Sequence, residues 1–262
     1  MLEAGDQSFS VVIVTSASLT GRIESYGIRI FRQDLQLVGI TVNTEHEEPR
    51  MRDALPAGYA YLHTVNRLPG AKGDLTTSLV KATLRLVRQH CPWVHGFRLN
   101  DTSTVFCTSS CTNVPLATLS LCYTGKTWYE RAFGARLEVG HAAYRALIME
   151  RMQTPENKPA FSDFANAHLS PSDPALLTRL RPAYESTTTL QEFFNTLRAS
   201  NTTEFCSLIM PWSIHMIDQL LLGAIKGSWI IVEQDCECEC EWGDWFHMID
   251  ERSIMLLPSD LM

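Results

Sequence analysis

Two consecutive stretches, Gly58-Tyr-Ala-Tyr-Leu-His-Thr-Val65 and Arg67-Leu-Pro-Gly-Ala-Lys-Gly73, decide the predicted fold. The first stretch indicates a strand, because residues two apart share one face of a strand and its side chains alternate accordingly. The residues expected on one face are Tyr59, Tyr61, His63 and Val65. The second stretch is a Pro-Gly turn, which ends the strand and leads into the next element.

A helix is expected after the turn, and a second strand after the helix. From Asp74, a natural N-cap, apolar residues recur at the helical period and basic residues form a stripe opposite them. The apolar residues are Leu75, Leu79, Val80, Leu84 and Val87, and the basic ones are Lys81, Arg85 and Arg88. Cys91-Pro92 ends this helix, and Val94–Leu99 is the next predicted strand. A Ser/Thr/Cys-rich loop through Asn113 then leads into a predicted helix over Leu116–Phe133.

The segment before Gly58 adds predicted strands to this α/β pattern, whereas the second half of the chain is predicted to be mainly helical. Strands are predicted over Ser10–Val14, Tyr26–Arg32 and Leu35–Val42, and a charged loop over Thr44–Pro56. The later pattern predicts helices over His141–Met152, Asp173–Leu180, Thr189–Ala199 and Ser213–Leu222, and one strand over Ser228–Val232. We therefore predict an α/β domain over residues 1–138 and a mainly helical region over residues 139–262, which packs on the first or stands apart from it.

Composition narrows the classes of protein to which the chain can belong. The 262 residues are 45% hydrophobic and carry a net charge of −7, which argues against a general nucleic-acid binder but does not exclude local basic stripes. No export signal and no apolar run of membrane-spanning length is visible. We expect a soluble, intracellular protein whose eight cysteines are thiols.

The turn after the first strand is a candidate anion site. Exposed backbone N–H groups and a helix dipole favour a pyrophosphate at such a position, and the residues expected to contribute are Arg67, Gly70, Lys72 and Gly73. The alternative is a Pro-Gly turn before a well-capped helix, with no ligand.

The order of these elements resembles the cofactor-binding core of GNAT-type N-acetyltransferases. Such enzymes carry an Arg/Gln-X-X-Gly-X-Gly/Ala turn, which Arg67 and Gly70 match, although Gly73 comes one residue late and Pro69 removes an N–H donor. Trp128-Tyr-Glu-Arg-Ala-Phe-Gly-Ala135 looks like the family's Tyr-Glu-Lys-Leu-Gly-Phe signature with one residue added. The resemblance implies a GNAT-like mixed sheet core flanked by helices.

The same resemblance implies a chemistry. The cofactor would be acetyl-CoA or another acyl-CoA, the acceptor an amine, and Tyr129 the general acid that protonates the leaving thiolate. His63, or Glu45, Glu47 and Glu48 in the loop before it, would be the base that deprotonates the amine. The alternatives are that Tyr129 packs beside Trp128 and Phe133 and that His63 is structural.

A longer motif points to a second group of proteins. Leu99-X-Asp101-X-Ser103, Cys107 and the segment from Gly125 to Ala135 are similar to uncharacterised proteins of large DNA viruses of eukaryotes. For a viral chain the expected location is the host cytoplasm. Gly125-Lys126-Thr127 does not complete a nucleotide-binding loop, because Ser120 occupies the position of its first glycine.

The cysteines do not predict a metal site. Cys236, Cys238 and Cys240 alternate with glutamates, and Cys107-X3-Cys111 has no obvious second pair, although His247 could join the C-terminal group. Three functional interpretations remain. One is an acyl-CoA N-acyltransferase, active or catalytically degenerate. The second is a non-enzymatic viral structural or host-interaction protein that retains the core and binds a protein partner, and the third and weakest is a cysteine-based metal or redox module.

Overall fold

A computed structural model describes residues 2–4, 7–17, 23–43, 58–66, 73–101, 103–107, 112–169, 174–200, 205, 208–210, 212 and 228–232. The chain divides into two compact units. The sheet unit contains the described residues up to Asn100, the segment Ala132–Arg136 and the strand near residue 230. The helical unit contains Asp101–Arg131 and the described residues from Leu137 to Trp212. The predicted boundary at residue 138 stays a prediction.

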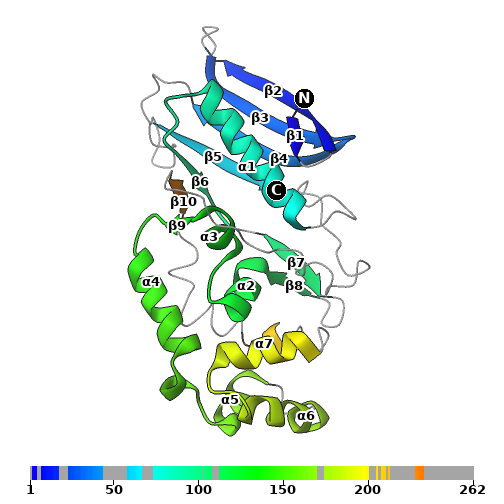
Figure 1. The fold of residues 1–262 in the computed structure, drawn as a ribbon, viewed down its shortest axis with the longest axis vertical. Coiled ribbons are helices and arrows are strands. Elements are labelled where there is room, and N and C mark those ends of the chain that lie inside the picture. The colour runs from blue at the N-terminus through cyan, green and yellow to red at the C-terminus, as the bar shows by residue number, and fades with distance from the viewer. Residues whose placement is uncertain are drawn as a thin grey trace. The chain divides into compact units, whose positions relative to one another are not determined.

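The sheet unit is built on one mixed sheet with the strand order β1-β2-β3-β4-β5-β6-β10-β9 (Figure 1). The strands are β1 (Leu2–Ala4), β2 (Gln7–Ala17), β3 (Ile23–Arg32), β4 (Leu35–Asn43), β5 (Tyr59–Val65), β6 (Gly96–Leu99), β9 (Arg136–Leu137) and β10 (Trp229–Val232). β5 and β6 are parallel, whereas β2 to β5 pair antiparallel and so do β6 and β10. The predicted α/β class and mixed sheet are confirmed.

A hairpin joins β3 and β4, which correspond to the strands predicted over Tyr26–Arg32 and Leu35–Val42. Arg32 pairs with Leu35, so that only Gln33 and Asp34 connect the strands. Gln33 has a φ of 54°, the left-handed conformation that a two-residue hairpin turn requires. β-Bulges interrupt the register between Ile30 and Phe31 and between Gly39 and Ile40. Each bulge adds a residue to one strand and increases the local twist.

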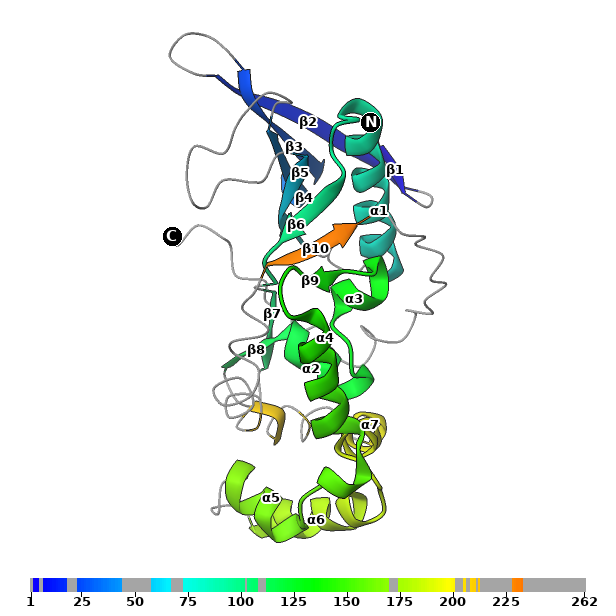
Figure 2. The ribbon, with the colours of Figure 1, turned by 90° about the vertical axis from the view of Figure 1, so that its left-hand side faces the viewer.

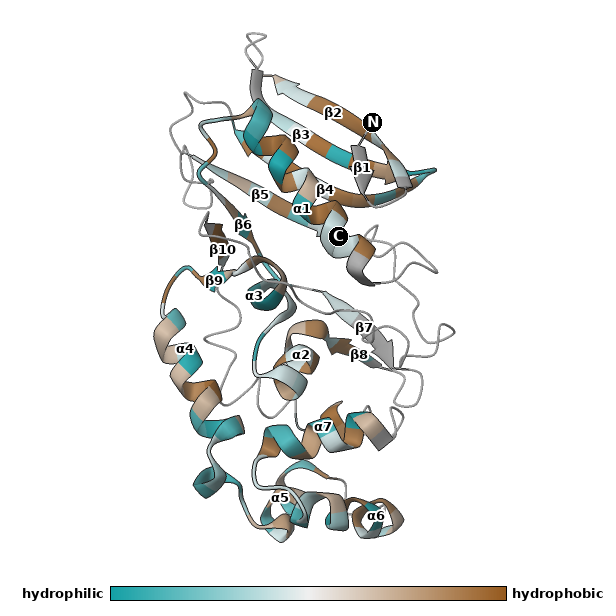
Figure 3. Cartoon of the chain, in the orientation of Figure 1, coloured by the Kyte–Doolittle hydropathy of each residue, from teal (hydrophilic) through white to brown (hydrophobic). Residues whose placement is uncertain are grey.

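The helix α1 (Gly73–His90) connects the parallel strands β5 and β6. It lies on one face of the sheet (Figures 1 and 2), and hydrophobic and hydrophilic residues alternate along it (Figure 3). Four of its five predicted apolar residues, Leu79, Val80, Leu84 and Val87, are at most 6% exposed, whereas Arg85 is exposed. The helix begins at Gly73, two residues before Leu75, the first helical residue that an N-cap at Asp74 predicts.

In the helical unit the first correction concerns the predicted loop that ends at Asn113. It contains a hairpin of β7 (Thr104–Cys107) and β8 (Thr112–Pro115), in which Val105 pairs with Val114. The Ser/Thr/Cys-rich composition suggested a loop, but Thr and Val are β-branched and favour strands when a partner strand is present.

The second correction concerns the predicted helix over Leu116–Phe133, which consists of two helices. α2 (Leu116–Thr124) ends at Gly125, whose φ is 66°, and α3 (Trp128–Phe133) begins three residues later. The Gly125 N–H donates to the Leu121 carbonyl at 2.8 Å, a C-cap that satisfies an end of α2. The described side chains of α2 from Ala117 to Tyr123 are buried. Apolarity all round a helix is typical of a helix in a core.

The remaining helices of this unit are α4 (His141–Ile148), α5 (Phe161–His168), α6 (Pro174–Glu185) and α7 (Leu190–Ser200). A π-helical turn, η1 (Met149–Gln153), continues α4, and a 3₁₀ turn, η2 (Pro155–Asn157), follows. Helix α5 was not predicted. The predicted Ser213–Leu222 helix and Thr44–Pro56 loop lie outside the described residues.

The helical unit interrupts the sheet along the chain. β9 comes before α4, whereas its sheet neighbour β10 comes after α7 and is inserted between β6 and β9. β10 confirms the strand predicted over Ser228–Val232, and its Trp229 is fully buried. Among the helices that the structure describes, none has the length and apolarity needed to cross a membrane.

Candidate functional site

The crossover from β5 through α1 to β6 is where the sequence predicts an anion site. β5 ends at Val65, and the next residue is anchored by two hydrogen bonds: the Asn66 N–H donates to the Leu37 carbonyl at 2.7 Å and its Nδ2 to the Gln36 carbonyl at 2.9 Å. Gly73 is the first residue of α1, and the N-terminal end of a helix dipole favours negative charge. Arg67, Gly70 and Lys72 lie outside the described residues, so their roles stay predictions.

His63, the predicted base, lies on β5 with an exposed side chain. Its Nδ1 and the Thr64 Oγ1 are 2.9 Å apart, and its ring lies over Gly39 of the neighbouring strand, where a Cβ would be 2.4 Å from Cε1. Desolvation of part of the ring, and secondarily the Arg29 guanidinium, lower the pKa of His63. The imidazole is therefore neutral at pH 7, the form that accepts a proton. The alternative bases Glu45, Glu47 and Glu48 lie outside the described residues.

Tyr129, the predicted acid, lies on α3 in the helical unit and is 7% exposed. Its ring packs edge-on against Trp128, with the ring centroids 4.7 Å apart. Burial first, and then the charge of Asp101, raise the pKa of Tyr129 well above its usual value. The phenol therefore holds its proton at all physiological pH values. Its ring also contributes to the buried packing of this unit.

Asp101 and Tyr129 belong to two separate parts of the longer motif, and the structure brings them into electrostatic range of each other. The Asp101 Oδ1 accepts a short hydrogen bond from the Ser103 hydroxyl and a second one, at 3.3 Å, from the Ser103 N–H. Desolvation raises the pKa of Asp101, and the two bonds from Ser103 oppose that rise. The Leu99-X-Asp101-X-Ser103 pattern thus forms a local turn beside the predicted acid.

The Gly-Lys-Thr segment has a structural explanation. Thr127 and Glu130 form a capping box at the start of α3: the Thr127 N–H donates to Glu130 Oε2 at 2.7 Å, and the Glu130 N–H donates to Thr127 Oγ1 at 3.2 Å. The Lys126 carbonyl accepts hydrogen bonds from the Ser120 and Thr124 hydroxyls at 2.7 and 3.0 Å. This segment joins two helices, and its side chains and backbone are used in that joint rather than arranged around a phosphate.

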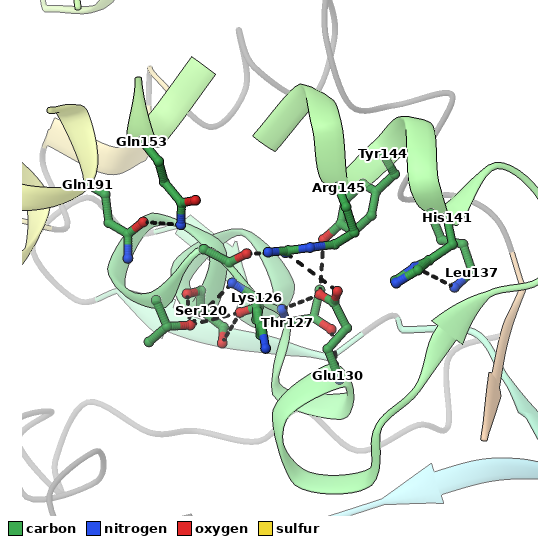
Figure 4. A network of polar contacts seen from close by, with 12 residues as sticks. Ser120, Lys126, Thr127, Glu130, Leu137, His141, Tyr144, Arg145, Gln153 and Gln191 are labelled. Atoms are coloured by element: carbon green, nitrogen blue, oxygen red, sulfur yellow. Dashed lines mark hydrogen bonds and ion pairs between the residues drawn. The ribbon is translucent and has the colours of Figure 1, made fainter. Parts of the chain in front are cut away.

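Glu130 also connects the joint to α4 (Figure 4). The Tyr144 hydroxyl donates to Glu130 Oε2 at 3.2 Å, and Arg145 Nη1 lies 3.6 Å from Glu130 Oε1 while donating a short bond to the Gly125 carbonyl. Burial and the adjacent Glu130 raise the pKa of Tyr144, and Arg145 partly offsets this rise. We call Gly125, Thr127, Glu130, Tyr144 and Arg145 the joint network. The Thr-X-X-Glu spacing of its capping box was visible in the sequence, whereas Tyr144 and Arg145 carried no signal.

The structure describes only some of the cysteines that the sequence analysis named. Cys91 and Cys122 are buried free thiols, and burial raises the pKa of both. Cys107 is described as part of β7, whereas Cys111, the Cys236, Cys238 and Cys240 run and His247 lie outside the described residues. Within the part of the chain that the structure describes, no three His, Cys, Asp or Glu side chains group as metal ligands would.

Comparison of the chain with protein-family models, with curated proteins and with solved structures gives no match.

Proposed function

We propose that this chain is an acyl-CoA-dependent N-acyltransferase-like protein. The observation that carries the proposal is the parallel crossover β5–α1–β6, because it has the strand, helix and strand order of the GNAT-type unit that the sequence resembles. The short helix α3 follows β6 along the chain and bears the Tyr129-Glu-Arg signature, as that resemblance also requires.

The start of α1 fits a pyrophosphate group. The helix of 18 residues is long enough to carry a full dipole, and its N-terminal end follows the predicted turn directly. In the proposal, Arg67 and Lys72 supply positive charge, and the backbone of Gly70 and Gly73 supplies N–H donors. Acyl-CoA would bring an activated thioester to this unit, and the acceptor is an amine of unspecified structure.

In the proposal the acyl group passes directly from the thioester to the amine, and each proton that moves has a donor and an acceptor. The amine nitrogen bonds to the thioester carbon, the carbon–sulfur bond breaks, and the amine proton passes to a base. Neutral His63 has the form of such a base. In the proposal the sulfur leaves as a thiolate and takes the phenolic proton of Tyr129, the acid that the resemblance implies.

One observation favours the second candidate function, a non-enzymatic structural or host-interaction protein that retains the core. Tyr129 is 7% exposed and packs against Trp128, as expected for a tyrosine whose role is to fill a core. In that case the turn with Pro69 binds no cofactor.

Titration of the purified full-length chain with acetyl-CoA by calorimetry tests the proposal. We expect saturable binding that Lys72→Gln weakens and that Lys126→Gln, which removes an exposed lysine of the helix joint, leaves unchanged. Tyr129→Phe should lower kcat about 100-fold with little change in the Kd for acetyl-CoA, because a general acid acts in the transition state.

Absence of binding at millimolar acetyl-CoA would exclude the acyltransferase and leave the non-enzymatic candidate. Equal losses of kcat and cofactor affinity in Tyr129→Phe, together with a lower Tm, would assign that tyrosine to packing.

A further inference from the structure

The sheet has a second face, opposite the one that α1 covers, and it carries tyrosine and arginine side chains. Residues paired directly across neighbouring strands project on the same side of a sheet. Arg29 pairs with Gly39, Thr41 pairs with Tyr61, and Tyr61 pairs with Arg98, so these positions follow one face from β3 to β6. The buried Ile28, Ile40, Leu62 and Phe97 belong to the other face. We call Arg29, Tyr59, Tyr61, His63 and Arg98 the tyrosine–arginine face.

Glycines make room for two of the rings on this face. A Cβ at Gly96 would lie 2.7 Å from the Tyr59 Cε1, and one at Gly39 would lie 2.4 Å from the His63 Cε1. Each ring therefore covers the backbone of the neighbouring strand, where any larger residue would displace it. The Tyr61 and His63 ring centroids are 6.4 Å apart and tilted by 32°. The rings lie side by side on the sheet and are not inserted into its core.

The charge of this face has the opposite sign to that of the whole chain. Arg29 is exposed and Arg98 is half-buried, and the described positions of β3 to β6 on this face include no Asp or Glu. His63 adds no charge at pH 7, because desolvation and Arg29 lower its pKa. The face is thus locally basic in a chain whose net charge is −7.

We propose that the tyrosine–arginine face binds single-stranded nucleic acid. Its half-buried tyrosines offer platforms on which unpaired bases stack, and its exposed Arg29 complements a phosphate between those bases. A double helix would present only its backbone to a sheet face, and its stacked bases could not reach the rings. An acidic peptide could pair with the arginines but has no group that needs flat rings seated on glycines.

Fluorescence anisotropy of a 5′-fluorescein-labelled, mixed-sequence 12-nucleotide RNA, with the same sequence in DNA, tests this inference on the full-length chain. We expect saturable binding at low salt that weakens as salt increases. Tyr61→Leu should reduce affinity about tenfold, because one stacked base is lost. Arg29→Gln should reduce the slope of log K against log salt concentration by about 0.7, which corresponds to one phosphate contact on a single strand.

Two controls separate this face from general charge and from misfolding. Arg85→Gln removes an exposed arginine from α1, on the covered face of the sheet, and should leave both affinity and salt slope unchanged. Tyr61→Phe keeps the ring and should bind as the unmodified chain does, even if Tyr61→Leu lowers the Tm.

Several results would overturn the proposal. They are no binding at 50 mM salt with tens of micromolar protein, or equal weakening by Arg85→Gln and Arg29→Gln. Equally effective competition by poly-glutamate would assign the face to acidic protein partners, and equal affinity for duplex RNA would exclude stacking.

Discussion

The sheet unit and the helical unit bury different kinds of side chain. In the sheet unit the buried core is mainly aliphatic and β-branched, with Ile28, Ile30, Val38, Ile40 and Val42 on neighbouring strands and Val80 and Val87 on the covering helix. In the helical unit aromatic rings make up a larger share of the buried core: Phe164, Tyr184, Phe193, Phe194, Phe205 and Trp212 are each at most 5% exposed. Phe193 alone lies within 6 Å, centroid to centroid, of three of these rings.

The difference follows from the way each unit is held together. Strands are connected by backbone hydrogen bonds, and branched aliphatic residues complete the surface on which a helix packs. Helices of 8 to 12 residues have no hydrogen bonds between their backbones, so large rings must span the gaps between them. Polar side chains then fix the ends of those helices, as in the joint network. The helical unit should therefore respond more strongly to single substitutions.

The largest expected effect comes from Phe193→Ala. Its ring is fully buried, and removing a buried Phe side chain costs about 3–5 kcal/mol in unfolding free energy. The loss should appear as reduced hydrogen-exchange protection in α2, α6 and α7. Ile40→Val in the sheet unit, the matched control, should cost about 1 kcal/mol. Equal loss of protection in α1 and β4 would show that the two units unfold together.

A smaller effect is expected from Gly125→Ala. The φ of 66° costs a residue with a Cβ about 1–2 kcal/mol, and the Cβ would lie 2.4 Å from Gln153 Nε2. That amide donates to Gln191 at 2.7 Å, and losing this bond adds about 1 kcal/mol, giving about 2–3 kcal/mol in urea unfolding.

Gly140→Ala is the control for that variant. Its φ is 74°, but no atom lies within 4 Å of the added Cβ, so only the cost of the left-handed conformation should appear, about 1–2 kcal/mol. Equal losses for the two variants would mean that the contact of Gly125 with η1 and α7 adds nothing.

The smallest of the three effects is expected from Glu130→Ala. Its carboxylate is 5% exposed and accepts bonds from the Thr127 N–H and the Tyr144 hydroxyl, so its removal should cost about 2 kcal/mol. Glu150 pairs with Arg151 at 3.8 Å, but both side chains are more than half exposed, and Glu150→Ala should change stability by less than about 0.5 kcal/mol. A cost for Glu150→Ala as large as that for Glu130→Ala would contradict the role of the joint network.

The predictions from sequence succeeded where the signal was periodic and local. Alternation along β3 and β5 and the helical spacing of α1 identified these elements, because each pattern reflects one buried and one exposed face. The helix break at Gly125 was missed, although the glycine and the Thr127-X-X-Glu130 spacing are local signals, because the apolar residues on both sides favour one continuous helix. For the candidate site, Tyr129 and Asp101 were named in one motif, but the effect of the Asp101 charge on Tyr129 depends on the folded structure, because the two residues are distant along the chain.

By itself, the sequence determined the α/β class, most strands of the sheet and the residues of the covering helix. The spacing at which apolar residues recur specifies which side chains must be buried, and this spacing can be read from residues that are close together in the sequence. Only the tertiary structure decided that β10 enters the sheet between β6 and β9, that Glu130 links α3 to α4, and that Tyr59 and His63 lie over glycines of neighbouring strands. These features depend on pairings between residues far apart in the chain, which no local pattern records.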